Sequence, residues 1–120
     1  MAKTTAIIGA SPRPDRYAYK ATMSLKNHGH KVYPVGIHEG NIDGESILTD
    51  KPQLTDVDTV TLYVGPQNQG AWKDYILSLK PKRIIFNPGT ENDAFEEEAK
   101  KKGIECVEGC TLVMLSIGQY

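Results

Sequence analysis

Short apolar runs alternate along this chain with segments in which apolar residues recur every three or four positions. The runs predict five β-strands, at residues 4–8, 31–36, 58–64, 83–86 and 104–107. The helical spacing predicts helices after residue 9, between residues 68 and 80 and between residues 90 and 102, with a last apolar turn or helix at residues 110–117. Strands and helices in this order imply βαβ crossovers. The pattern therefore predicts an α/β fold, a Rossmann-like, doubly wound and mainly parallel five-stranded sheet with helices on both faces.

Glycines, prolines and capping residues predict where these elements begin and end. Gly29 is expected to end the first helix, and Pro34 is expected near the end of the second strand, because a proline is awkward inside a central strand. The polar residues that could cap a helix start are Ser11 or Asp15, Asn68, and Thr90 or Asn92. In the third helix, glutamates at positions 96–98 precede lysines at positions 100–102 by four residues, which predicts a solvated face with exposed ion pairs.

The composition limits the class of protein. A single domain over residues 1–120 is expected, since this length can bury a core and no linker interrupts the pattern. The longest apolar run, residues 112–115, is too short for a membrane span, and the N-terminus lacks the apolar segment of a signal peptide. We therefore expect a cytoplasmic protein that does not bind membranes. Its two cysteines, Cys106 and Cys110, are expected to be reduced and to hold no metal.

The charge is small overall but unevenly distributed. A net charge of −1 argues against bulk nucleic-acid binding. The first 31 residues nevertheless contain one acid, Asp15, and six basic residues: Lys3, Arg13, Arg16, Lys20, Lys26 and Lys31. Several of these surround the glycine at position 9, and such a local positive field suits a phosphorylated small molecule.

The ends of the predicted strands carry the functional signal, because ligands of doubly wound sheets bind beyond the carboxyl ends of the strands. These ends lie at residues 9–11, 34–36, 63–66, 87–90 and 108–110; each contains a glycine and none supplies a paired acid and base. We expect the turn at Gly9 and the helix start behind it to direct unpaired amides toward a space that a diphosphate fills. Arg16 would stand in the first turn of this helix, where a cation is disfavoured unless an anion joins it.

An NAD site is the first alternative, and the sequence fits it poorly. The turn has only the first glycine of the dinucleotide pattern G-x-G-x-x-G, with Ser11 and two prolines where the pattern requires more glycine. The second strand ends in Gly36-Ile37-His38, without the carboxylate that holds a ribose hydroxyl, and Glu39 lies further into the loop.

A longer set of residues resembles a known family. The set comprises Gly9 to Pro14 with Arg16 to Lys20, then Leu25, Gly29, Pro34-Val35, Gly44, Asp58 to Val60, Pro88-Gly89 and Cys110. In this order, from about residue 4 to the C-terminus, it resembles the small single-domain CoA-binding family, which is similar in fold to the N-terminal domain of the succinyl-CoA synthetase alpha subunit.

The resemblance implies four groups of cofactor contacts. Gly9, Ala10 and Ser11 would face the CoA pyrophosphate, with Arg13, Arg16 and Lys20 as charged partners; Pro34, Val35 and Gly36 would border the adenosine; Val64, Gly65 and Pro66 would form the opposite wall; and Asn87, Pro88 and Gly89 would form the floor.

The resulting hypothesis is a protein that binds CoA or an acyl-CoA without catalysis of its own. In the synthetases that the chain resembles, the catalytic histidine lies in another domain, so a separate catalytic partner is one expectation. The apolar residues Val113 and Leu115 near the C-terminus predict a homodimer as the other. The alternatives are a small NAD(P)-dependent oxidoreductase and a ligand-sensing regulatory module. His38 lies on a ligand-facing loop and Cys110 follows the last strand, whereas Trp72 and Tyr75 have the helical spacing of core residues.

Overall fold

The structure is a computed structural model that describes residues 2–120. Its elements are β1 (Thr5–Ile8), α1 (Tyr17–Asn27), β2 (Val32–Val35), β3 (Asn41–Ile42), β4 (Glu45–Ser46), β5 (Thr59–Leu62), the 3₁₀ helix η1 (Pro66–Ala71), α2 (Lys73–Ser78), β6 (Arg83–Phe86), α3 (Asp93–Lys101), β7 (Glu105–Glu108) and α4 (Thr111–Ser116). None of the helices in residues 2–120 is long and apolar enough to cross a membrane.

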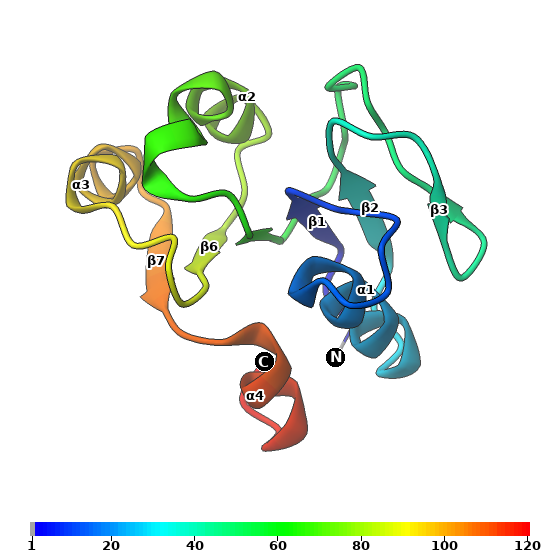
Figure 1. Cartoon of the computed structure of the whole chain (residues 1–120). Helices are drawn as coiled ribbons and strands as arrows, with labels where there is room; N and C mark the ends of the chain where they lie inside the picture. The colour runs from blue at the N-terminus through cyan, green and yellow to red at the C-terminus, as the bar shows by residue number, and fades with distance from the viewer. Residues whose placement is uncertain (1) are drawn as a thin grey trace.

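Five strands form one sheet in the order β2-β1-β5-β6-β7, and every neighbouring pair is parallel. The chain passes outward from β1 to β2, then returns to the other side of β1 and continues through β5, β6 and β7. Helices α2 and α3 cover one face of this sheet, and α1 and α4 cover the other (Figure 1). The predicted doubly wound parallel sheet is therefore confirmed, and its strand order reverses between β1 and β5.

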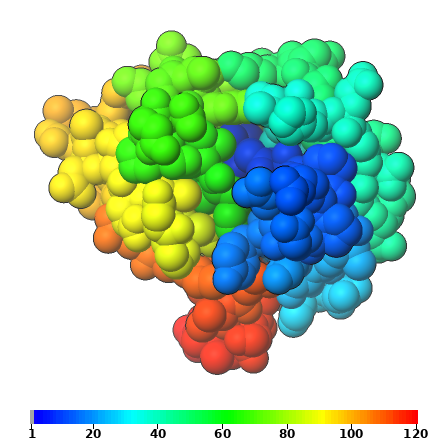
Figure 2. Space-filling model, in the orientation of Figure 1, coloured from blue at the N-terminus to red at the C-terminus, as the bar shows by residue number. Residues whose placement is uncertain are grey.

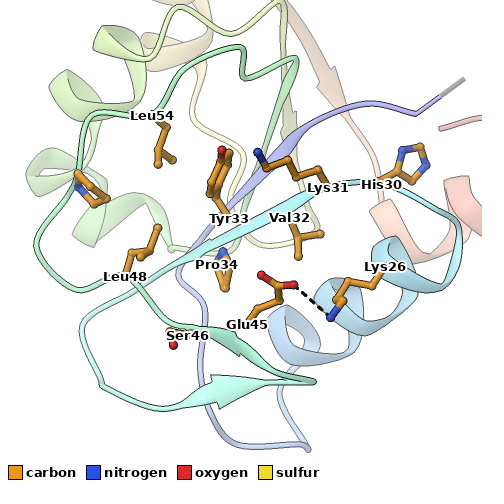
Figure 3. Close-up of a pocket in the computed structure, with 11 residues that line it drawn as sticks. Lys26, His30, Lys31, Val32, Tyr33, Pro34, Glu45, Ser46, Leu48 and Leu54 are labelled. Atoms are coloured by element: carbon orange, nitrogen blue, oxygen red, sulfur yellow. Dashed lines mark ion pairs between the residues drawn. The ribbon is translucent and has the colours of Figure 1, made fainter.

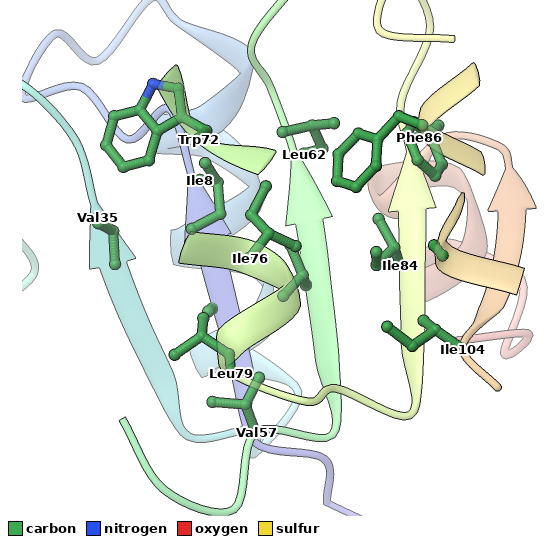
Figure 4. Packing of buried hydrophobic residues seen from close by; sticks show 14 residues of the cluster. Ile8, Val35, Val57, Leu62, Trp72, Ile76, Leu79, Ile84, Phe86 and Ile104 are labelled. Carbon is green, nitrogen blue, oxygen red and sulfur yellow. The ribbon is translucent and has the colours of Figure 1, made fainter. Parts of the chain in front are cut away.

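The core consists of two apolar layers, one on each face of the sheet. Successive strand residues point to opposite faces, so Ile7 packs toward α1 and α4 while Ile8 packs toward α2 and α3. On the latter face Leu62 and Phe86 extend the layer from the neighbouring strands, and α2 contributes Ile76 (Figure 4). A fully buried aliphatic or aromatic side chain of this kind contributes about 1.5–3 kcal/mol, so these layers hold the strand ends in fixed positions.

The start of α1 differs from the prediction. Neither Ser11 nor Asp15 caps the helix; its N-cap is Arg16, and no side chain accepts a hydrogen bond there. Two prolines, Pro12 and Pro14, explain the delay, because a proline keeps the residue before it out of the helical region. Asp15 instead forms an ion pair with Arg13 at 3.5 Å. A loop of eight residues therefore separates β1 from α1.

The second helix also differs in detail. Asn68 does not cap a continuous helix: it lies inside η1, which begins at Pro66, and α2 follows with Trp72 as its N-cap. Pro34 is the penultimate residue of β2 and pairs with Ile7, so its predicted place near the end of the strand is confirmed. This position is tolerated because β2 is an edge strand, where a missing amide breaks no inner ladder. Asn92 is confirmed as a cap, since its side-chain oxygen accepts a hydrogen bond from the Phe95 amide.

The face of α3 that was expected to be solvated is only partly so. Glu97 and Lys101 form the expected pair four residues apart, at 3.4 Å. Glu98 pairs instead with Lys73 of α2 at 3.0 Å. Glu96 is 7% exposed, so its predicted place on the outer face is wrong. The cause is the position of β7, whose last residue, Glu108, lies beside it.

Candidate functional site

A cavity of about 680 Å³ opens at the carboxyl edge of the sheet, where the segments after β1, β5 and β6 meet. Figure 2 shows this hollow between the blue segment that follows β1 and the green and yellow segments that follow β5 and β6. Its lining is Gly9, Ala10, Ser11, Arg13, Arg16, Tyr17, Ala18, Ile37, His38, Tyr63, Val64, Gly65, Asn68, Trp72, Pro88, Gly89 and Thr90. The volume falls within the range of about 300–1,000 Å³ that is typical of small-molecule sites.

The turn after β1 is held rigidly by the end of β2. The amides of Gly9 and Ala10 both donate to the Val35 carbonyl oxygen at 2.9 Å. Gly9 has a φ of +97°, and a Cβ there would lie 3.0 Å from a methyl carbon of Val64. A Cβ on Gly36 would lie 2.3 Å from the Ala10 carbonyl oxygen. Glycine is therefore required at both positions, once for the backbone conformation and once for the close approach of two segments.

These hydrogen bonds correct one expectation from the sequence. The turn was expected to present unpaired amides, but those of Gly9 and Ala10 are both occupied, and of the three turn residues only Ser11 has an amide that donates to no acceptor in residues 2–120. Three more unpaired donors lie at the start of α1, where the amides of Tyr17, Ala18 and Tyr19 donate to no acceptor in the described chain and the Arg16 cap supplies none. Because Tyr17 and Ala18 line the cavity, the positive end of the α1 dipole faces it.

The charged side chains around the cavity all favour an anion. Arg13 and Arg16 line it, and no aspartate, glutamate or lysine does. Arg13 is partly neutralised by Asp15, which stands outside the lining. Tyr63 carries no charge at neutral pH, since burial raises the pKa of its hydroxyl well above the usual value of 10. The cavity therefore combines two guanidinium groups with a helix N-terminus.

The wall opposite the arginines is fixed by a buried glutamine. Gln69 is 2% exposed, and its amide nitrogen donates to the carbonyl oxygens of Val64, at 2.8 Å, and Thr90, at 2.7 Å. Its amide oxygen accepts a hydrogen bond from the Asn92 side chain at 2.9 Å. These three bonds join the segments after β5 and β6, so that Gly65 and Gly89 line one continuous surface.

Comparison with known proteins places this chain in a family. A family profile described as "CoA binding domain" matches residues 3–116. The chain belongs to the CoA-binding domain family. A crystal structure titled only as an uncharacterized protein is 55% identical to this chain, with a TM-score of 0.98. The match covers 100% of this chain and 99% of that protein. No curated protein matches the sequence.

Solved structures of lower identity share the same fold. A hypothetical protein from Pyrococcus horikoshii OT3 is 26% identical over 97% of this chain and 83% of its own, with a TM-score of 0.83. A protein from Thermus thermophilus is 24% identical over 99% of this chain and 91% of its own, with a TM-score of 0.84, and at that identity it shows the fold alone.

The predicted contact residues of this CoA-binding domain divide into two sets. Those that line the cavity are Gly9, Ala10, Ser11, Arg13, Arg16, Val64, Gly65, Pro88 and Gly89. Those outside the lining are Lys20, Pro34, Val35, Gly36, Pro66 and Asn87. The ammonium group of Lys20 lies 5.3 Å from the centre of the Tyr17 ring. Val35 and Gly36 contact the back of the turn. Cys110, which follows the last strand, is half-buried and lies outside the lining.

Asn87 has a structural role at the end of β6. It is 1% exposed, and its side-chain nitrogen donates to the Thr61 hydroxyl at 2.7 Å and to the Leu62 carbonyl oxygen at 2.9 Å. Its side-chain oxygen accepts a hydrogen bond from the Thr111 amide at 2.9 Å. Asn87 thus anchors the first residue of α4 under the sheet, and the floor of the cavity is formed by the two residues that follow it.

Several lining residues were not predicted as contacts. They are Tyr17, Ala18, Ile37, Tyr63, Asn68, Trp72 and Thr90. Most lie next to a strand end or in the first turn after one, which is the signal that could have identified them. Trp72 is 7% exposed and belongs to the core as expected, but it also contributes to the cavity wall.

A second hollow, of about 490 Å³, lies against the outer edge of β2 (Figure 3). Its wall is mainly apolar, with Tyr33, Leu48 and Leu54 around the edge of the strand. The ammonium group of Lys26 is 3.2 Å from the Glu45 carboxylate. Because this charge is paired and the hollow is not built on the carboxyl ends of the central strands, the first cavity is the better site for an anionic ligand.

Proposed function

We propose that this protein binds coenzyme A, or an acyl-CoA, in the cavity at the carboxyl edge, and that it catalyses no reaction of its own. Family membership supports CoA as the ligand class. The observation that carries the proposal is the uncapped start of α1, where three amides without protein acceptors adjoin two arginines in a cavity lined by no carboxylate. An anion of the size of a diphosphate would satisfy these amides and both guanidinium groups.

The energetic case rests on charge-assisted hydrogen bonds. Each bond from an arginine or a free amide to a phosphate oxygen contributes about 1.5–3 kcal/mol, because the acceptor is charged. The side chain of Arg16 has no ion-pair partner in the described chain, so it is available to a ligand at no cost in broken contacts. Arg13 would first have to leave Asp15, a pair whose side chains are 63% and 68% exposed and which is therefore weak.

Binding without chemistry is proposed because the lining offers no acid–base pair. His38 is the only histidine in the lining, it is exposed, and no described carboxylate hydrogen-bonds to it. A homodimer or a separate catalytic partner remains a prediction. Of the two residues expected to support a homodimer, Val113 is 53% exposed, whereas Leu115 is 5% exposed and belongs to the core, so the expectation is wrong for Leu115. The neighbouring apolar residue Ile117 is 62% exposed. If the protein were a ligand-sensing regulatory module, a partner protein would bind it only when its ligand is bound.

Calorimetry and thermal shift with CoA, acetyl-CoA, NAD, NADP and AMP test the proposal. CoA at about one hundred times its Kd adds about 2.7 kcal/mol to the stability of the folded state. Arg16→Ala should weaken CoA binding at least tenfold and leave AMP binding unchanged, because AMP has no diphosphate. Lys82→Ala, which removes the same charge at the amino edge of the sheet, is the matched control.

Two results would contradict the proposal. Tighter binding of NAD or NADP than of CoA would favour the oxidoreductase alternative. Equal effects of Arg16→Ala and Lys82→Ala on CoA would show a general charge effect and no contact at the start of α1.

A further inference from the structure

Three carboxylates from two elements converge at the outer edge of the sheet, away from the cavity. Asp93 and Glu96 lie on the first turn and a half of α3, and Glu108 is the last residue of β7. One oxygen of each carboxylate lies within 4.8 Å of the others. The sequence gives no warning of this cluster, because Glu108 is separated from the two helix residues by a turn and a strand.

The buried member of the cluster lacks a partner. Glu96 is 7% exposed, and its Oε2 atom has no hydrogen-bond partner in the described part of the chain. An ionised carboxylate buried in this way is strongly destabilising unless a cation or donors compensate for its lost hydration. Both burial and the neighbouring Glu108 raise the pKa of Glu96, which reflects the same lack of compensation.

No lysine or arginine in the described chain pairs directly with these carboxylates, and the charge of Lys100 offsets the rise in the pKa of Glu96 only in part. Within residues 2–120, neither Asp93, Glu96 nor Glu108 takes part in an ion pair. The adjacent glutamates differ, because Glu97 and Glu98 each form an ion pair with a lysine. The N-terminus of α3 favours negative charge at its first turn, but it donates no hydrogen bond to the Oε2 atom of Glu96.

We propose that Asp93, Glu96 and Glu108 form a binding site for a divalent cation, with Ca²⁺ as the best-fitting ion. Ca²⁺ binds oxygen ligands at about 2.3–2.6 Å, so two ligands of one ion lie at most about 5 Å apart. The 4.8 Å spread of the three carboxylate oxygens fits this limit. Mg²⁺, with ligands at about 2.0–2.1 Å, would require the cluster to contract. Two of the ligands are exposed, so water completes the shell and the affinity falls in the range of about 0.1–1 mM.

The ion would link α3 to the edge strand β7. Glu108 ends the part of β7 that pairs with β6, and Asp93 begins the helix that leads back to β7. A cation bound by both residues would therefore connect the start of α3 to the end of β7 at the outer edge of the sheet. This role needs no CoA, so it is independent of the function proposed above.

Titration of the metal-free protein with CaCl₂, at constant ionic strength, tests the site. Saturable heat by calorimetry and a rise in melting temperature are expected for the natural sequence. Asp93→Asn and Glu108→Gln, both at exposed positions that should not disturb folding, are each expected to weaken Ca²⁺ binding at least tenfold. Glu97→Gln removes the same charge from the adjacent position of α3 and should bind as the natural sequence does.

Three outcomes would overturn the inference. The first is the absence of saturable binding up to about 10 mM CaCl₂, ten times the weak end of protein calcium sites. The second is an equal loss in Glu97→Gln, which would indicate a diffuse charge effect. The third is that Glu108→Gln stabilises the metal-free protein while Ca²⁺ has no effect, which would show that Glu96 and Glu108 share a proton and bind no metal.

Discussion

The close contact between Gly36 and the turn after β1 gives the sharpest test of how the candidate site is built. In Gly36→Ala, the new Cβ would lie 2.3 Å from the Ala10 carbonyl oxygen, whereas real Cβ contacts essentially never fall below 3.0 Å. The turn must therefore retreat by at least about 0.7 Å. A shift of this size along the hydrogen bonds from the Gly9 and Ala10 amides to the Val35 carbonyl oxygen would lengthen their nitrogen–oxygen distances from 2.9 Å to about 3.6 Å. That distance lies outside hydrogen-bond range.

The cost follows from those two bonds. Each buried amide left without an acceptor costs about 1–3 kcal/mol, so the loss of both bonds in Gly36→Ala should destabilise the protein by about 2–6 kcal/mol. At about 4 °C per kcal/mol for a domain of this size, the melting temperature falls on the order of 10 °C. Because the turn lines the cavity, CoA binding should also weaken, by at least tenfold, in calorimetry below the new melting temperature.

A second glycine separates the effect on binding from the effect on stability. Gly103 follows α3 with a φ of +81°, and a Cβ added there would have no neighbouring atom within 4 Å. Gly103→Ala therefore costs about 1–2 kcal/mol through its backbone conformation alone. It lies outside the cavity lining and should retain full CoA affinity. If Gly36→Ala also binds CoA as the natural sequence does, the turn is not part of the binding site and the reasoning fails.

Two further predictions concern the supports of the site and the pH dependence of stability. Gln69→Leu leaves the Val64 and Thr90 carbonyl oxygens without their buried donor, so chemical denaturation should show a loss of about 2–4 kcal/mol, and a change below about 0.5 kcal/mol would mean that water replaces the amide. The pKa of His30 is lowered mainly by burial and secondly by the nearby charge of Lys3. The Nδ1 atom of His30 accepts a hydrogen bond from the Lys3 amide. The unfolded chain thus binds more protons than the folded chain as the pH falls through about 6.5, so stability should fall as the pH drops below that value. His30→Asn, whose amide oxygen can replace Nδ1, should flatten this part of the profile of melting temperature against pH, and an unchanged slope would assign the loss to other groups.

The fold was predictable because its signals are local and repeat along the chain. Each central strand is a short apolar run, each helix has an apolar face, and each connection carries a glycine, a proline or a capping residue such as Asn92. These signals determine the order of the elements, and the right-handed crossover rule then leaves few topologies. The errors fall where two local signals compete. Pro12 and Pro14 delay α1 although Ser11 and Asp15 could cap it.

The cavity was predictable in position but not in its hydrogen bonds. The strand ends identified Gly9, Arg16 and Gly89 as neighbours, because the topology of a doubly wound sheet brings them to one edge. Which amides are free depends on contacts between distant segments, and no local pattern reveals that the Val35 carbonyl occupies those of Gly9 and Ala10.

The occupied amides change where an anion is expected to bind, and this has a consequence for the family resemblance. A glycine turn after the first strand indicates a phosphate site when its own amides are free, yet here β2 uses two of them to fix the shape of the turn. The turn then forms a rigid wall of the cavity. Glycine is required at position 36 because this residue packs closely against the turn, and not because a ligand contacts it. Apart from the Ser11 amide, the free donors lie further along the chain, at the start of α1, beside Arg16. A bound diphosphate should therefore lie closer to Ala18 than to Gly9, and that displacement is measurable by mutation. Substituting Arg16 should weaken CoA binding directly, whereas substituting Gly36 weakens it only by moving the wall.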